Sequence, residues 1–119
     1  MVDNDEDMRD IVRTALSHAG FDTLGASSAK QALSFLDHVV PEVIVLDLLL
    51  ADMDGVELAK EIRWRSSCAQ TPMVMLTGAP EVAEQQLFKA GLDVEVFAKP
   101  IALDVVTRKI EDLCRPLVQ

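Results

Sequence analysis

Two short apolar runs constrain the fold of this chain most. Residues 43–46 and residues 73–76 are each an unbroken run of four apolar residues. An unbroken run of this length is typical of a strand that is buried on both faces, as in a parallel sheet covered by helices. A polar residue follows each run at once, Asp47 after the first and Thr77 after the second. The sequence therefore predicts two buried parallel strands that end on polar side chains.

Segments with helical periodicity separate the predicted strands. Apolar residues recur at helical spacing in five segments, 8–19, 32–36, 56–62, 82–90 and 103–113. Gly20 and Gly91 follow the first and fourth of these, where a helix commonly stops. Residues 21–24 and 94–97 predict two further short strands. Strict alternation of strands and helices with short connections predicts an α/β domain, with helices on both faces of a parallel sheet.

Size and charge narrow the classes of function. The 119 residues fit one domain, and we assign residues 1–119 to it. Twenty acidic and eleven basic residues give a net charge of −9. We expect no direct nucleic-acid partner, because binding to phosphate backbones requires clustered Lys and Arg. No targeting or membrane-spanning segment is visible, and the two cysteines lack metal-like spacing, which favours a cytoplasmic protein with reduced thiols.

Polar residues follow four of the predicted strands. Asp3 and Asn4 follow a first strand of which only Met1 and Val2 are present. Asp47 and Thr77 follow the two apolar runs, and Lys99 follows the last predicted strand, residues 94–97. A parallel sheet places all of them at one edge, where such sheets bind their ligands. Oxygen ligands suit Mg²⁺, lysine supplies a positive charge for phosphate, and threonine supplies a hydroxyl donor. A single aspartate after a strand is more often a helix cap or a turn former, so the prediction depends on the whole set.

Five separated motifs carry a resemblance to a known family. They are residues 2–9 (Val-Asp-Asn-Asp-Glu-Asp-Met-Arg), residues 43–47, Met53-Asp54-Gly55, residues 75–78 (Met-Leu-Thr-Gly) and Lys99-Pro100. In this order they resemble the CheY-like receiver domain of bacterial two-component response regulators, over essentially the whole chain. The resemblance implies a flavodoxin-like (βα)5 fold with a five-stranded parallel sheet of order 2-1-3-4-5.

The resemblance also implies roles for individual residues. Asp47 would accept a phosphoryl group from a sensor histidine kinase or a phosphotransfer protein. Thr77 would bind a phosphoryl oxygen, and Lys99 would pair with the phosphoryl or carboxylate oxygens. The family usually has a cis peptide bond before the residue equivalent to Pro100.

A magnesium ion is the cofactor that the resemblance implies. Asp3 and Asn4 occupy the positions of the family's acidic pair, Asp47 would share the ion, and the backbone carbonyl of Leu49 would complete the coordination. Asn4 departs from the pattern because its amide oxygen can bind the metal but brings no charge. We therefore expect weaker metal binding than with two carboxylates.

The first strand is the second departure. Only Met1 and Val2 precede Asp3, so the strand is apparently truncated. Loss of most of a central strand exposes strand edges. Exchange of strands in a homodimer is one possible repair.

Three functions are compatible with these residues. The first is a phosphoacceptor switch, not a turnover enzyme, that signals to an unknown downstream protein through protein–protein contact. The second is a degenerate receiver that binds a partner without phosphorylation, which Asn4 favours and the intact set of Asp47, Thr77 and Lys99 opposes. The third is a Mg²⁺-dependent aspartyl phosphatase, although Leu49 stands where such an enzyme has its second aspartate.

Overall fold

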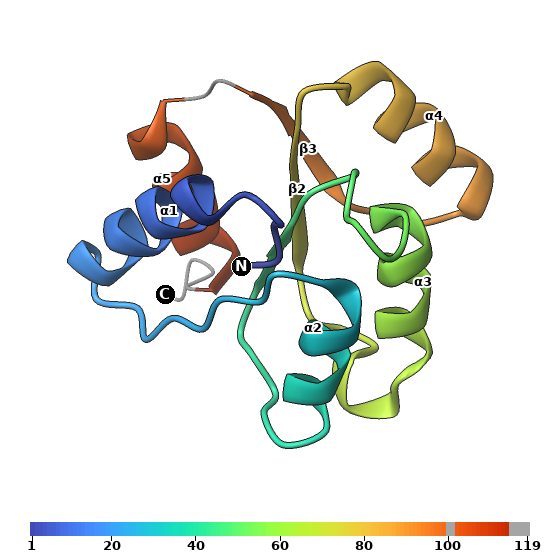
Figure 1. The fold of residues 1–119 in the computed structure, drawn as a ribbon, viewed down its shortest axis with the longest axis horizontal. Helices are drawn as coiled ribbons and strands as arrows, with labels where there is room; N and C mark the ends of the chain where they lie inside the picture. The colour runs from blue at the N-terminus through green and yellow to red at the C-terminus, as the bar shows by residue number, and fades with distance from the viewer. Residues whose placement is uncertain (100–101, 115–119) are drawn as a thin grey trace, which may run out of the picture.

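The computed structural model describes residues 1–99 and 102–114, and these form five α-helices around a parallel sheet (Figure 1). In chain order the elements are α1 (Glu6–His18), α2 (Ala29–Leu36), β1 (Ile44–Leu46), α3 (Gly55–Trp64), a 3-10 turn η1 (Ser66–Cys68), β2 (Met73–Thr77), α4 (Pro80–Ala90), β3 (Glu95–Ala98) and α5 (Leu103–Cys114). The predicted α/β fold class is confirmed, and strands alternate with α-helices from β1 to α5, whereas no strand is assigned between α1 and α2. No helix within the described part of the chain combines the length and the apolar character needed to cross a membrane.

The sheet has the predicted strand order. β1, β2 and β3 are parallel neighbours in that order. On the outer side of β1, Val2 forms one parallel bridge to Leu46 and a second to Ala26. Across the sheet the segments therefore lie in the order Ala26, Val2, β1, β2, β3. Val2 stands for the first of the five expected strands, Ala26 for the second, and β1, β2 and β3 for the third to fifth, so this is the expected order 2-1-3-4-5. The first and second of these strands are each reduced to a single bridged residue, Val2 and Ala26, as expected from the short first strand.

The strand predicted at residues 21–24 is wrong. This segment has no strand assignment, and the residue that pairs with Val2 is Ala26. Backbone bonds from Ala26 N to Met1 O (2.8 Å) and from Asp3 N to Ala26 O (3.1 Å) hold the pair. A strand needs a ladder of partners, and only Met1 and Val2 are present beside this segment.

Helices cover both faces of the sheet. α1 and α5 contact each other on one face, and α2, α3 and α4 lie on the other (Figure 1). β1 and β2 are buried along their whole length. Alternate strand residues enter two separate clusters, with Val45 and Val74 facing α1 and α5 and with Leu46 and Met75 facing the other three helices. Burial on both faces explains why these two strands read as unbroken apolar runs.

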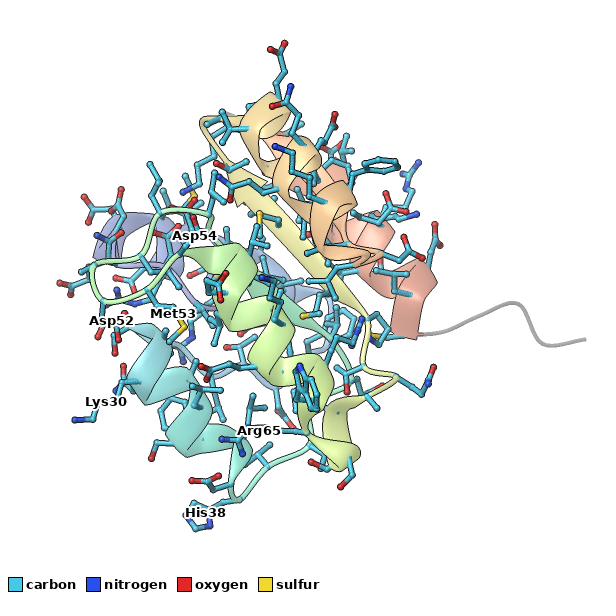
Figure 2. All side chains as sticks on the ribbon, turned by 90° about the vertical axis from the view of Figure 1, so that its right-hand side faces the viewer. Lys30, His38, Asp52, Met53, Asp54 and Arg65 are labelled. Atoms are coloured by element: carbon cyan, nitrogen blue, oxygen red, sulfur yellow. The ribbon has the colours of Figure 1, made fainter. Side chains whose placement is uncertain are left out.

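Short polar side chains fix the starts of three helices near the carboxyl edge of the sheet. Asp5 caps α1, Ser28 caps α2 and Asp54 caps α3, each by accepting backbone N–H bonds. Asp52 adds a long-range cap, since its carboxylate accepts hydrogen bonds from the backbone N–H groups of Ala29 and Lys30 at 3.0 Å each (Figure 2). The backbone bonds from Lys30 and Ala29 lower the pKa of Asp52. The loop after β1 is thereby tied to the start of α2.

Candidate functional site

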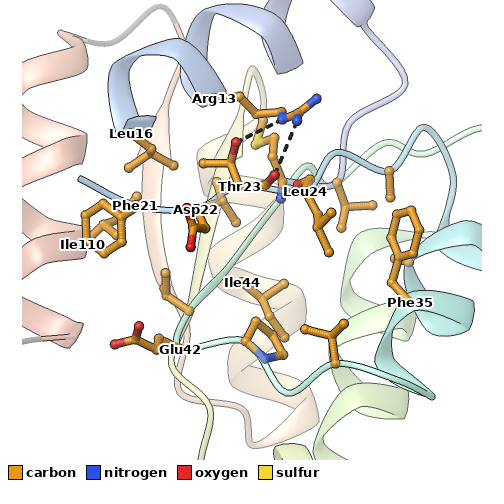
Figure 3. Close-up of a pocket in the computed structure, with 18 of the residues that line it drawn as sticks. Arg13, Leu16, Phe21, Asp22, Thr23, Leu24, Phe35, Glu42, Ile44 and Ile110 are labelled. Carbon is orange, nitrogen blue, oxygen red and sulfur yellow. Dashed lines mark hydrogen bonds between the residues drawn. The ribbon is translucent and has the colours of Figure 1, made fainter. Parts of the chain in front are cut away.

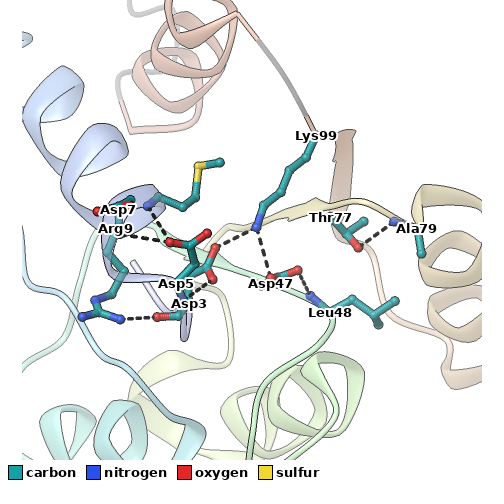
Figure 4. A network of polar contacts seen from close by, with 10 residues as sticks. Asp3, Asp5, Asp7, Arg9, Asp47, Leu48, Thr77, Ala79 and Lys99 are labelled. Carbon is teal, nitrogen blue, oxygen red and sulfur yellow. Dashed lines mark hydrogen bonds and ion pairs between the residues drawn. The ribbon is translucent and has the colours of Figure 1, made fainter.

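Four polar residues meet at the carboxyl edge of the sheet (Figure 4). Asp3 follows the bridge residue Val2, Asp47 follows β1, Thr77 ends β2, and Lys99 follows β3. The structure thus brings four sequence-predicted site residues to one edge. Their common position follows from the parallel direction of the strands.

Lys99 joins the two carboxylates of the site. Its Nζ lies 2.8 Å from Asp3 Oδ2 and 3.1 Å from Asp47 Oδ2. The Asp3 side chain is fully buried, the Asp47 side chain is 12% exposed and the Lys99 side chain is 18% exposed. Two carboxylates with one ammonium leave one net negative charge at a largely buried position. Such a site favours an additional cation.

The two carboxylates raise the pKa of Lys99. Burial is the largest single effect and lowers this pKa, because it removes water from the ammonium group. Hydrogen bonds from Lys99 to Asp3 and Asp47, together with the two negative charges, outweigh burial. The ammonium is therefore the stable form at neutral pH.

Backbone N–H groups orient the second oxygen of each carboxylate. Asp47 Oδ1 accepts from Leu48 N at 2.7 Å, and Asp3 Oδ1 accepts from Asp5 N at 3.0 Å. In both residues Oδ1 is held by the main chain while Oδ2 contacts the Lys99 ammonium. Asp47 Oδ2 is therefore the oxygen held beside a positive charge.

The remaining predicted residues have different settings. Thr77 is buried, and its Oγ1 accepts a bond from Ala79 N at 3.0 Å, while its backbone carbonyl accepts from Lys99 N at 2.8 Å. Asn4 is exposed just before α1. Leu49 is 66% exposed, and its backbone pairs with Asp54. Metal ligation by Asn4 and by the Leu49 carbonyl stays a prediction, and the peptide bond before Pro100 lies outside the described residues.

Two supporting residues were not recognised from the sequence. Arg9 donates from Nη1 to the Asp3 backbone carbonyl at 2.7 Å. Gly55 lies so close to the main chain of Asp47 that a β-carbon would collide with the Asp47 carbonyl oxygen and approach Leu48 Cα to 2.8 Å. The Met53-Asp54-Gly55 motif carried part of the family resemblance, and only the packing of α3 against the end of β1 reveals the contact of Gly55 with Asp47.

The donor set fits magnesium in part. Asp3 and Asp47 supply carboxylate oxygens at one point, and Mg²⁺ prefers oxygen ligands and retains several waters. In residues 1–99 and 102–114, no group of three or more His, Cys, Asp or Glu side chains could hold a metal ion. Asp5, a nearby carboxylate, uses Oδ1 to cap α1 through Asp7 N and Met8 N. A metal here would therefore rely on two carboxylates, water, and neutral oxygens such as those predicted from Asn4 and Leu49.

Comparison with known proteins assigns the family. The family model described as the response regulator receiver domain matches residues 1–111. The chain belongs to the response regulator receiver domain family. The receiver resemblance read from the five motifs is thus confirmed.

Solved receiver structures share the fold. Chemotaxis response regulator CheY4 of Vibrio cholerae superimposes with a TM-score of 0.84 at 26% identity, covering 94% of this chain and 93% of CheY4. NtrX from Brucella abortus, solved in complex with ADP, gives a TM-score of 0.83 at 29% identity and covers 95% of this chain but 26% of NtrX. The flavodoxin-like receiver fold is therefore common to this chain and to both proteins.

Curated relatives are mostly longer than this receiver domain. The transcriptional regulatory protein TrcR of Mycobacterium tuberculosis is 30% identical over 116 residues, which are 97% of this chain and 44% of TrcR. Response regulator MprA of Mycobacterium leprae is 31% identical over 117 residues, which are 96% of this chain and 49% of MprA. The chain therefore spans about half the length of these relatives, and the similarity covers that part of them.

Proposed function

We propose that this receiver domain is a phosphoacceptor switch in which Asp47 takes a phosphoryl group from a histidine kinase or a phosphotransfer protein. The observation that carries the proposal is the position of Asp47 Oδ2, 3.1 Å from Lys99 Nζ at the carboxyl edge of the sheet. The same ammonium binds Asp3, so a positive charge is already fixed where the phosphoryl oxygens would arrive. Phosphoryl transfer depends mainly on positioning and on neutralising charge, and this arrangement supplies both.

The reaction follows from the two oxygens of Asp47. Oδ1 remains bound to Leu48 N, and Oδ2 attacks the phosphorus atom of a phosphohistidine. The new O–P bond forms as the P–N bond breaks, and the released imidazole nitrogen keeps the electron pair and takes a proton from solvent. Lys99 then pairs with a phosphoryl oxygen, and the Thr77 hydroxyl donates to another. Asp3 holds Lys99 from the opposite side throughout.

A magnesium ion is included in this proposal as the group that neutralises phosphoryl charge when bound. Asp3 and Asp47 would hold it, with Asn4 and the Leu49 carbonyl as the neutral ligands. Asn4 in place of a carboxylate lowers the negative charge of the metal site, so we propose a weaker metal site than one with two adjacent acids.

The output of the switch is a change in binding to another protein. We propose a cytoplasmic domain that alters its surface on phosphorylation and performs no turnover chemistry beyond the loss of its own phosphoryl group. The longer relatives TrcR and MprA are named as a transcriptional regulatory protein and a response regulator. For this chain, the downstream partner is a protein still to be identified, and the net charge of −9 argues against direct binding to nucleic acid.

Intact-mass measurement with a small phosphodonor tests the proposal. The chain is incubated with Mg²⁺ and acetyl phosphate, and one labile phosphoryl adduct is expected. Asp47→Asn should abolish the adduct, whereas Asp10→Asn, which changes an exposed carboxylate on α1, should retain it. An adduct that persists in Asp47→Asn contradicts the assignment of the acceptor.

Two other results would replace the proposal. If neither phosphate nor beryllofluoride binds in the presence of Mg²⁺, the domain is a phosphorylation-independent binding module, as the neutral Asn4 would favour. Repeated hydrolysis of a phosphoester by the wild-type chain, lost in Asp47→Asn, would instead show a phosphatase.

A further inference from the structure

Two aromatic side chains project from the surface formed by α3 and α4. Trp64 is 88% exposed and Phe88 is 87% exposed, the highest values among the exposed large apolar side chains of the described residues. The other three aromatic residues are partly buried, since Phe21 and Phe35 line a cavity (Figure 3) and Phe97 packs against the core. An aromatic ring stabilises a fold through the area that it buries. Folding of this chain therefore does not account for Trp64 and Phe88.

The two aromatic residues lie at the same end of neighbouring helices. α3 and α4 contact each other and lie side by side on the face shown in Figure 2. Each helix starts at the carboxyl edge of the sheet and returns to the amino edge, so the two run in the same direction. Trp64 is the last residue of α3, and Phe88 is the third from last of α4. At a rise of about 1.5 Å per residue, both lie about 12–14 Å from the first residue of their helix.

Glutamates extend the same surface toward the starts of the helices. One and two turns before the aromatic residue, each helix exposes a glutamate, namely Glu57 and Glu61 on α3 and Glu81 and Glu84 on α4. Residues three, four and seven apart lie on one side of a helix. The surface therefore has three rows, which together we call the α3–α4 outer face. They are an aromatic row (Trp64, Phe88), a near acidic row (Glu61, Glu84) and a far acidic row (Glu57, Glu81).

The α3–α4 outer face has an excess of negative charge. Four glutamates stand against two lysines of the same helices, Lys60 and Lys89, which leaves two negative charges. The two arginines that flank Trp64 bind other groups. Arg63 donates to backbone carbonyls that follow α3, and Arg65 pairs with a carboxylate at the end of α2 at 2.7 Å (Figure 2). These two cations are therefore directed away from the glutamates.

Helix dipoles explain only one of the two acidic rows. Glu57 and Glu81 lie in the first turns of their helices, where a carboxylate complements the positive end of the dipole. Glu61 and Glu84 lie beyond the first turn, where this effect has fallen off. The near acidic row, next to the aromatic row, therefore carries charge that the helices themselves do not require.

This combination of residues selects the chemistry of an occupant. Exposed Trp and Phe bind apolar side chains and the cations of Lys and Arg, and the glutamates attract the same cations. An anionic lipid surface and a nucleic acid would both be repelled by the acidic rows. A second copy in a two-fold dimer would present the same acidic rows. The complementary partner is a protein segment that is both apolar and basic.

We propose that the α3–α4 outer face docks a basic amphipathic helix of another protein. The apolar end of that helix packs on Trp64 and Phe88, and its lysines or arginines one and two turns away pair with the near and far acidic rows. A helix supplies this spacing because its side chains at i, i+4 and i+7 lie on one side. Docking requires no phosphoryl group on Asp47, so its test is independent of the proposed phosphoacceptor function.

The fluorescence of Trp64 provides a direct test, since it is the only tryptophan in the chain. The whole unphosphorylated chain is titrated with the basic peptide acetyl-Lys-Ala-Ala-Lys-Lys-Ala-Ala-Leu-Ala-Ala-Leu-Leu-amide. A matched acidic peptide has Glu in place of every Lys. The basic peptide alone should shift the emission to shorter wavelength, because docking removes the indole ring from water. The shift should weaken as salt is added, because these charges are exposed.

A variant of the aromatic row tests the apolar contact. Phe88→Ala should raise the Kd of the basic peptide about tenfold, as expected for the loss of an aromatic anchor. Val105→Ala removes a half-exposed apolar side chain from α5 and should leave the Kd unchanged. Urea denaturation of both variants should show wild-type stability, because both side chains lie on the surface.

A charge reversal tests the near acidic row. The double variant Glu61→Lys, Glu84→Lys should bind the basic peptide at least about tenfold more weakly and should bind the acidic peptide instead. The double variant Asp10→Lys, Asp112→Lys makes the same change of net charge at exposed positions of α1 and α5. It should keep the wild-type preference for the basic peptide.

Four outcomes would overturn the proposal. An unchanged emission with the basic peptide, or an equal response to both peptides, would show that the face does not select a basic helix. Equal Kd values for Phe88→Ala and the wild type would place the peptide elsewhere. Sedimentation as a dimer that Phe88→Ala separates would make the occupant a second copy. A shift of the emission on vesicles of phosphatidylcholine and phosphatidylserine would make it a lipid surface.

Discussion

Gly55 lies against the backbone carbonyl of Asp47 with no room for a β-carbon between them. The contact joins the first turn of α3 to the residue proposed to accept phosphate. It is reinforced by the bond from Gly55 N to Leu48 O at 2.6 Å. The position of the acceptor therefore depends on a residue that carries no side chain.

Gly55→Ala is expected to displace the main chain of Asp47. The added methyl group would force a shift in rigid backbone, and such overpacking costs about 1–3 kcal/mol in the free energy of unfolding. Phosphorylation by acetyl phosphate should slow by a factor on the order of 10 to 100, because the acceptor oxygen moves away from Lys99. Urea denaturation and the rate of adduct formation measure the two effects.

Gly78→Ala is the matched control for this prediction. It lies just after Thr77 at the same edge of the sheet, and a β-carbon there meets nothing within 4 Å. Its stability should stay within about 0.5 kcal/mol of the wild-type value. Similar losses in both variants would refute the steric explanation.

Lys99→Met is expected to leave the fully buried Asp3 carboxylate without its ammonium partner. Removing one member of a fully buried pair costs about 3–5 kcal/mol, and the partial exposure of Lys99 reduces the expected loss to about 1–3 kcal/mol. The exposed Lys89 on α4 provides the control, since Lys89→Met should change stability little. Urea denaturation at pH 7 measures both, and equal stability of the wild type and Lys99→Met would show that the pair contributes nothing.

The stabilising effect of Lys99 should disappear at alkaline pH. The folded protein raises the pKa of Lys99, so folding favours the protonated form. The contribution is fully present below the unfolded pKa of about 10.4 and is lost as the pH rises through the higher folded value. The stability difference between the wild type and Lys99→Met should stay constant from about pH 7 to 9 and shrink above about pH 10.4. A difference that is unchanged at pH 11 would contradict the assigned ion pair.

The Met1 amino group should make stability depend on pH near neutrality. Its pKa falls from 8.0 to about 6 on folding, so the unfolded chain binds more protons between these values. Stability therefore rises with pH from 6 to 8, by about 2 kcal/mol for a shift of this size. The free energy of unfolding, measured by denaturation of protein whose Met1 is verified by mass spectrometry, should rise over this pH range. An N-acetylated form should show no such rise. An identical pH profile for the acetylated form would contradict the assignment of this titration to the Met1 amino group.

Asn4→Asp is expected to strengthen magnesium binding. The substitution restores a second carboxylate next to Asp3 at an exposed position, where the cost of adding a charge is low. We expect the Kd for Mg²⁺, measured by calorimetry, to fall by roughly tenfold, or about 1.4 kcal/mol. The exposed Gln31→Glu change on α2 is a control for added negative charge alone. An unchanged Kd in Asn4→Asp would remove Asn4 from the metal site.

The sequence by itself determined the layers and the edge at which the site forms, whereas the strand order was implied by the family resemblance of its five motifs. Unbroken apolar runs at 43–46 and 73–76 require burial on both faces, and parallel strands then bring Asp47 and Thr77 to the same edge. The same strand-end pattern predicted Asp3 and Lys99 at this edge, and in the structure Lys99 donates hydrogen bonds to both Asp3 and Asp47. These features depend on local pattern and chain direction, which are both readable along the sequence.

Only the tertiary structure decided the contacts between segments far apart in the chain. Asp52 capping α2, Gly55 against Asp47, and the register that places Ala26 rather than residues 21–24 beside Val2 all depend on packing in three dimensions. The physical reason is that a pattern of residues determines which surface is buried, whereas distances and voids arise only when those surfaces meet.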